Sequence, residues 1–175
     1  MLENCTRLVP GIETVQGDMR DLRLDRRFDA VLIHDAIDYM STASDVRAAL
    51  ATAAAHLTPG GAVFVAPTYI RENFVDGEVA SETATSHGLT YLSYVHDRDP
   101  SDSEYELLLV YLIRERTDRT VEVIEDRHTC GLFSEPEWLS MLSAAGFEAS
   151  PLENARAWTL FGGTLRERVS RDSPE

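Results

Sequence analysis

A chain of 175 residues with a formal net charge of −14 is long enough for one domain with a hydrophobic core and too short for two ordinary ones. The acidic balance disfavours a surface for nucleic acids or anionic membranes, because phosphate binding depends on clusters of Lys and Arg. All 16 basic residues are Arg, so reactions that need a lysine nucleophile or a Schiff base are excluded. A small-molecule or protein partner is therefore expected.

The cysteines and the hydropathy pattern favour a cytoplasmic protein. Cys5 and Cys130 lie far apart and belong to no Cys-x-x-Cys or Cys/His spacing, so free thiols and no metal site are expected. Residues 1–15 lack the apolar core of a signal peptide, and no apolar run approaches the ~20 residues that span a bilayer. The chain is expected to be soluble and unexported.

Residues 12–66 predict three strands and one helix. Residues 12–16 resemble a short strand, and residues 28–33 form an apolar run typical of a strand buried on both faces. Apolar residues recur at helical spacing over residues 42–57, before a Pro-Gly-Gly turn at 59–61, and residues 62–66 predict another buried strand. This order predicts parallel pairing and a doubly wound α/β sheet.

The second half of the chain has a different pattern. Three β-rich runs, at residues 89–96, 105–114 and 121–126, predict an antiparallel β-meander appended to the parallel sheet. Ser134 and Glu137 then form the capping box of a helix.

The expected organisation is a single domain over residues 1–169. It contains a parallel α/β part at 12–67, the meander at 89–127 and a C-terminal helix at 134–146. Residues 170–175 are expected to form a disordered tail.

Polar segments follow the predicted parallel strands. In open α/β sheets, ligands bind outside the carboxyl ends of these strands. This rule places three segments on one rim, namely Asp18-Met19, His34-Asp35 and Pro67-Thr68-Tyr69. The sequence therefore predicts one ligand crevice there.

Three motifs occur in the order and spacing of class I S-adenosylmethionine-dependent methyltransferases. The first, Gly17-Asp18-Met19-Arg20, resembles the adenine-contacting motif after the third strand of that family. The second, Phe28-Asp29-Ala30-Val31, resembles its fourth strand. The third, Leu57-Thr58-Pro59-Gly60-Gly61, resembles the turn before its fifth strand. The resemblance implies a partial Rossmann-like fold and S-adenosylmethionine as the cofactor.

The resemblance also assigns residues to the cofactor. Asp18 would accept a hydrogen bond from the adenine amine, Met19 would contact the ring face, and His34 and Asp35 would lie near the methionine end. The alternative for Asp18 is a turn residue that satisfies its own backbone. The alternative for His34 and Asp35 is a polar strand end bonded to neighbouring loops.

The latter half resembles bacterial methyltransferases that dimethylate the amino group of nucleotide-linked deoxysugars. The segments that carry this likeness include Tyr94-Val95-His96, Asp126-Arg127-His128, Gly131-Leu132-Phe133 and Leu160-Phe161-Gly162-Gly163. The resemblance implies that His96 and His128 are catalytic, with His96 as the base and His128 holding the weaker claim. Amine methylation needs a free nitrogen lone pair, and an imidazole can take the proton. The alternative for each histidine is a structural hydrogen bond on a strand.

Two features of this family do not occur in the sequence. They are the glycine-rich turn after the first strand and the acidic residue that ends the second, while residues 1–3 resemble the helix that follows. Either the start codon lies further upstream, or the chain is a remnant that serves as a non-catalytic binding module or homodimer. The in-frame sequence upstream of Met1 discriminates between these hypotheses.

The sequence therefore predicts methyl transfer from S-adenosylmethionine to a small-molecule acceptor, such as an amino group of a nucleotide-linked sugar. His34 and Asp35 are more polar than the residues of the sugar-methylating family at those positions, which leaves the acceptor open. N-, O- and C-methylation also stay open.

Overall fold

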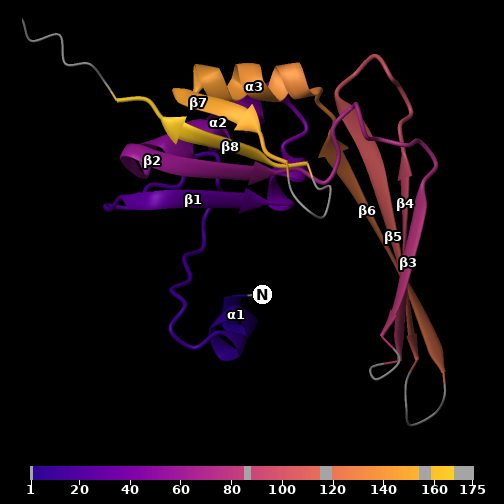
Figure 1. The fold of residues 1–175 in the computed structure, drawn as a ribbon. Helices are drawn as coiled ribbons and strands as arrows, with labels where there is room; N and C mark the ends of the chain where they lie inside the picture. The colour runs from indigo at the N-terminus through magenta and orange to yellow at the C-terminus, as the bar shows by residue number, and fades with distance from the viewer. Residues whose placement is uncertain (1, 85–87, 115–119, 154–158, 168–175) are drawn as a thin grey trace, which may run out of the picture.

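The protein folds into two sheets that lie side by side (Figure 1). The computed structural model describes residues 2–84, 88–114, 120–153 and 159–167. One sheet has the strand order β1-β2-β8-β7 and the other the order β3-β4-β5-β6. The fold class expected from the sequence, a partial Rossmann-like α/β sheet with an appended antiparallel meander, is confirmed. The expected tail at 170–175 lies outside the described residues.

The first sheet is built around one parallel pair. Strand β1 (Phe28–His34) pairs in parallel with β2 (Leu57–Ala66), and helix α2 (Ala43–Ala55) makes the connection. Strand β8 (Phe161–Leu165) pairs antiparallel with β2, and β7 (Phe147–Pro151) pairs antiparallel with β8. Because β1 and β2 are parallel, their carboxyl ends reach the same edge of the sheet.

Two capped helices cover this sheet. The hydroxyl of Thr42 accepts a hydrogen bond from the backbone N–H of Asp45 and so begins α2. Helix α3 (Glu135–Ala144) begins with the capping box of Ser134 and Glu137. The core between the helices and the sheet is formed mainly by fully buried apolar side chains: Val46, Leu50, Leu57, Val63, Val65, Trp138, Leu142, Phe147 and Phe161.

The second sheet is a four-stranded antiparallel meander. It consists of β3 (Val79–Ala84), β4 (Leu89–His96), β5 (Glu104–Arg114) and β6 (Val121–Gly131). One end of the meander packs beside the α/β part, and the other end projects away from it (Figure 1). At the packed end Val95, Tyr105, Cys130 and Leu132 form a second buried cluster.

Two expectations about the first strands are wrong. Residues 12–16 are irregular, because a strand exists only through hydrogen bonds to a neighbour and none of the described segments pairs with them. Strand β1 is covered on one face rather than two. Its Val31 and Ile33 pack against the core, whereas Leu32 on the opposite face is 68% exposed.

Helix α1 (Leu2–Leu8) lies apart from both sheets and has no buried residue (Figure 1). Within the described part of the chain, no helix combines the length and apolar character that crossing a bilayer would require.

Candidate active site

The carboxyl ends of β1 and β2 form one rim, as the sequence predicted for parallel strands. His34 is the last residue of β1 and Asp35 follows it, while Pro67 and Thr68 follow β2. Together with Asn73 and neighbouring residues, they line a pocket of about 330 Å³. The side chains of His34 and Asp35 contact each other, with Nδ1 and Oδ2 3.1 Å apart. The structure therefore brings this pair to the expected crevice.

A sharp turn follows β1 and sets the direction of the next side chains. Asp35 has a φ of +52°, and its backbone N–H donates to the carbonyl of Ala66. The short 3-10 helix η1 (Ala36–Tyr39) begins there. Asp38 then lies inside the protein at 7% exposure, while the Tyr39 side chain stays 54% exposed at the rim. Neither residue was assigned a role from the sequence.

Asp38 ties the two rim loops together. Both of its carboxylate oxygens accept from the backbone N–H of Thr68, at 3.2 and 3.1 Å. Burial raises the pKa of Asp38 from its ordinary 3.8 to about 6, although the Thr68 hydrogen bonds act in the opposite direction. At neutral pH the fold therefore holds an ionised carboxylate in a site that favours its protonated form.

This burial predicts a pH-dependent stability that depends on Asp38. The pKa is raised on folding, so the ionised carboxylate destabilises the fold above pH 6, and the cost is relieved as the pH falls towards 4. We expect the stability of Asp38→Asn relative to the parent to rise by about 2 kcal/mol between pH 4 and 7. Urea denaturation at both pH values measures this difference. Asp21→Asn, at an exposed loop position, is the control. A pH-independent difference for Asp38→Asn would contradict the prediction.

A shallow hollow lies beside η1, lined mainly by Gly17, Asp18 and Met19 on one side and by Tyr39 and Met40 on the other. Met19 also packs against the hydrophobic core, and this contact holds its side chain beside the hollow. The hollow thus offers an acidic group and an apolar thioether side by side.

Asp18 is held by Arg20. The Arg20 backbone N–H donates to Oδ1 at 2.9 Å, and its guanidinium donates to Oδ2 at 2.7 Å and to Oδ1 of Asp45 at 3.0 Å. The Arg20 side-chain hydrogen bonds lower the pKa of Asp18 to about 2, so its carboxylate is ionised at neutral pH. The turn that the sequence offered as an alternative therefore exists, and the same carboxylate also lines the hollow.

The two faces of the meander differ in what they contact. Val95, Tyr105 and Cys130 point to one face, where they pack with Tyr69 and Phe74 next to the α/β part. We call this the inner face. His128 lies on it, because strand residues two apart share a face and Cys130 is buried there.

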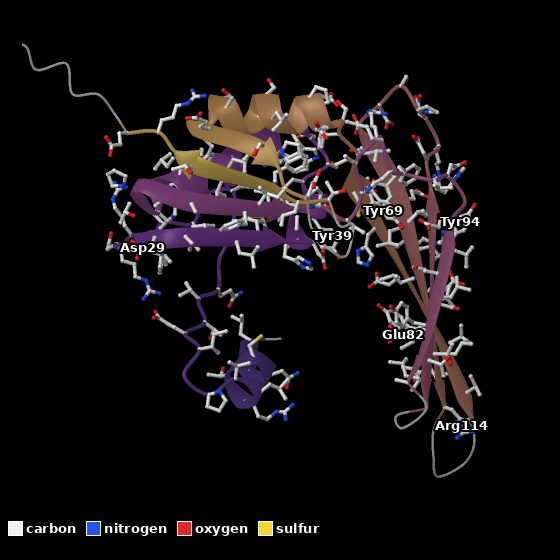
Figure 2. The ribbon with its side chains drawn as sticks, viewed as in Figure 1. Asp29, Tyr39, Tyr69, Glu82, Tyr94 and Arg114 are labelled. Carbon is white, nitrogen blue, oxygen red and sulfur yellow. The ribbon has the colours of Figure 1, made fainter. Side chains whose placement is uncertain are left out.

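His128 contacts Tyr39, which lies at the rim. The two rings meet edge to face with centroids 5.4 Å apart, and the imidazole is 22% exposed. Oδ2 of Asp126, also on the inner face, lies 3.2 Å from Nε2 of His128. Figure 2 shows Tyr39 between the first sheet and the meander.

His96 lies on the opposite, outer face. Its neighbour on that face is Tyr94, whose ring stacks on the imidazole at 6.2 Å. Figure 2 shows Tyr94 on the side of the meander that is turned away from Tyr39. Nδ1 of His96 lies 2.8 Å from Oδ1 of Asp76, which also accepts from the backbone N–H of Asp97. The structure therefore brings His128 to the rim and does not bring His96 there.

Sequence reasoning missed Tyr39, Asp38 and Asp126. Tyr39 follows strand β1 by only a few residues, and this proximity to the rim was the signal that could have found it. Within the described ranges no cluster of three or more His, Cys, Asp or Glu could hold a metal ion.

Known proteins are similar to the chain in both sequence and fold. Residues 1–61 match the methyltransferase domain family. The chain is 33% identical over 155 residues to dTDP-3-amino-3,4,6-trideoxy-alpha-D-glucopyranose N,N-dimethyltransferase from Streptomyces venezuelae, across 87% of this chain and 64% of that protein.

Two solved structures are similar to the chain in fold. DesVI from Streptomyces venezuelae is similar with a TM-score of 0.83 at 29% identity, across 95% of this chain and 70% of that one. CalS10, an amino pentose methyltransferase from Micromonospora echinaspora solved with S-adenosylmethionine, gives a TM-score of 0.79 at 26% identity, across 93% of this chain and 69% of that one.

In fold, rim and motifs the chain is similar to class I S-adenosylmethionine-dependent methyltransferases. Among these enzymes it is similar to N,N-dimethyltransferases of nucleotide-linked amino sugars. It spans between 57% and 64% of the length of three such relatives.

Proposed function

We propose that the protein transfers the methyl group of S-adenosylmethionine to an amino group of a small sugar acceptor, with nucleotide-linked amino sugars as the first candidates. The observation that carries this proposal is the position of Tyr39. Its side chain lines the hollow that holds Asp18 and Met19, and its ring contacts His128 of the meander. The proposed cofactor site and the proposed proton acceptor therefore both contact Tyr39.

For the cofactor, the residues of the rim have suitable chemistry. Asp18 is ionised and retains lone pairs beyond those used by Arg20, so it can accept from the adenine amine. Met19 provides a polarisable contact for the ring face. We assign His34 and Asp35, at the neighbouring pocket, to the methionine end. When bound, the cofactor supplies a methyl group on sulfonium, and the chain's own residues align the acceptor with it.

For the proton transfer, the proposal favours His128. An alkyl amine is protonated at neutral pH and must lose a proton before its lone pair can attack. His128 is partly exposed, faces the rim and can take that proton. The contacts of His96 with Asp76 and Tyr94 favour the structural alternative for that residue.

The experiment is a methylation assay of the purified protein with S-adenosylmethionine and dTDP-3-amino-3,6-dideoxy-alpha-D-glucopyranose, the sugar in the name of the similar enzyme from Streptomyces fradiae. Mass spectrometry should detect products with one and two added methyl groups. The matched control is the same sugar nucleotide with a hydroxyl in place of the amine. Equal methylation of the control would contradict N-methylation, and no methylation of any amino sugar would contradict the proposed function.

A further inference from the structure

We propose that Asp126 is a positioning residue for methyl transfer: it orients the imidazole of His128 at the rim and stabilises the imidazolium that forms there. The inference rests on the proposed function, in which His128 takes a proton from the acceptor amine. It adds a residue for which neither the motifs nor the cofactor site provide a role.

The imidazole of His128 contacts two side chains, Asp126 and Tyr39. Asp126 and His128 project from the inner face of β6, opposite Leu109 and Leu107 of the neighbouring strand β5. Oδ2 of Asp126 lies 3.2 Å from Nε2 of His128, and the Tyr39 ring meets the imidazole edge to face. The carboxylate contacts Nε2 of the imidazole, so Nδ1 remains to take the proton of the acceptor amine.

The neighbouring cation does not compete with His128 for Asp126. Arg127 is the adjacent residue in sequence, but it points to the outer face of β6, where its guanidinium lies 3.2 Å from Oε2 of Glu125. Asp126 therefore faces His128 and the rim, while the neighbouring cation is paired on the other side of the sheet.

The carboxylate of Asp126 affects the two ring nitrogens of His128 differently. An ionised carboxylate only accepts hydrogen bonds, so it favours the tautomer with the proton on Nε2 and leaves the lone pair on Nδ1. When the acceptor ammonium gives its proton to Nδ1, the ring becomes a cation next to Asp126, and the opposite charges stabilise it.

The electron pair released on the amine nitrogen then forms the new bond to the methyl carbon. The electrons of the breaking sulfur–carbon bond stay on sulfur, which leaves as a neutral thioether. A second methyl transfer needs one further proton removal of the same kind, because the methylated amine is again formed as a cation.

The test uses Asp126→Asn and Asp126→Ala, with Glu125→Gln on the outer face of the same strand as the matched control. The first readout is the ¹⁵N spectrum of the neutral imidazoles, in which His128 is assigned from the signal lost in His128→Asn. We expect the Nε2–H tautomer of His128 to dominate in the parent and in Glu125→Gln, and a mixture of both tautomers in Asp126→Ala. This readout does not depend on catalysis.

The second readout is the rate of methylation of the amino sugar nucleotide. We expect kcat to fall at least ~10-fold in both Asp126 variants with KM nearly unchanged, because the carboxylate acts through His128 and does not contact the acceptor. The melting temperature should stay near that of the parent, since the Asp126 side chain is 55% exposed. A merely structural role would lower stability together with rate.

The outcomes separate the two proposals. If the parent methylates amino sugars and both Asp126 variants match Glu125→Gln, the inference about Asp126 is overturned and the proposed function stands. If the parent methylates no acceptor, the proposed function fails. The imidazole spectrum then decides on the pair, and an unchanged tautomer in Asp126→Ala overturns it.

Discussion

The His128→Asn variant should lose turnover by about 10²–10⁴-fold, the usual contribution of a general base. Asparagine keeps a hydrogen-bonding side chain at the Tyr39 contact but cannot take a proton at neutral pH. Cofactor affinity should stay at the parent level, because Asp18 and Met19 belong to a different loop. Initial rates at saturating substrates and calorimetric titration of the cofactor measure the two quantities.

The comparison variant is His96→Asn, on the outer face of the same meander. We expect it to lose much less turnover than His128→Asn and to lose thermal stability through the broken contact with Asp76. The reverse order of rate losses would assign the base to His96. Equal rate losses that follow the stability of the two variants would contradict a general base at either position.

Trp138→Ala should lower the free energy of unfolding by about 3–5 kcal/mol, the typical cost of removing a large aromatic side chain from a core. Trp138 is 2% exposed, stacks on Phe161 with centroids 5.8 Å apart, and meets Phe133 edge to face at 5.9 Å. It therefore connects α3 to the sheet. Urea denaturation followed by circular dichroism measures the loss.

Trp138→Phe is the matched control for this position. The indole Nε1 is buried and has no hydrogen-bond partner among the described residues, so replacing the indole with a phenyl ring sacrifices volume but no hydrogen bond. We expect a loss on the order of 1–2 kcal/mol. Similar losses for the two variants would show that aromatic packing at this site contributes little.

The sequence was informative where one local pattern determined the structure. In α2, Val46, Ala49, Leu50 and Ala53 follow the helical period and are all buried. The apolar run at residues 28–33 became β1, and the turn residues between the runs at 89–126 separated β4, β5 and β6 within a few residues. Hydrophobic periodicity and turn chemistry suffice for such elements.

Other elements depended on distant partners. Strand β8 contains Gly162 and Gly163, which disfavour a strand when considered alone. They fit because β7 approaches closely: a Cβ at Gly163 would lie 2.9 Å from that of Ala149. Every residue of strand β3 is exposed, so its sequence has no buried apolar face that would predict a strand. Long-range pairing creates these strands, and no local window contains it.

The site shows the same division. The rim segments at His34 and Thr68 follow from the parallel strands, and the structure brings them together. Alternation along β4 places His96 and Tyr94 on one face, but only the burial of Val95 shows which face meets the core. Asp38 looked like one more polar loop residue, because nothing in its neighbours indicates that η1 turns it inward.

The turn at Asp35 also limits which residues the chain can accept there. A φ of +52° favours Gly and disfavours most side chains, with Asn and Asp among the better tolerated. The contact with His34 favours a carboxylate. Glu satisfies only the charge and Gly only the backbone, so Asp alone among the acidic residues suits both requirements. The backbone and the His34 contact therefore restrict the residue types at this exposed position, as packing restricts them at a position in the core.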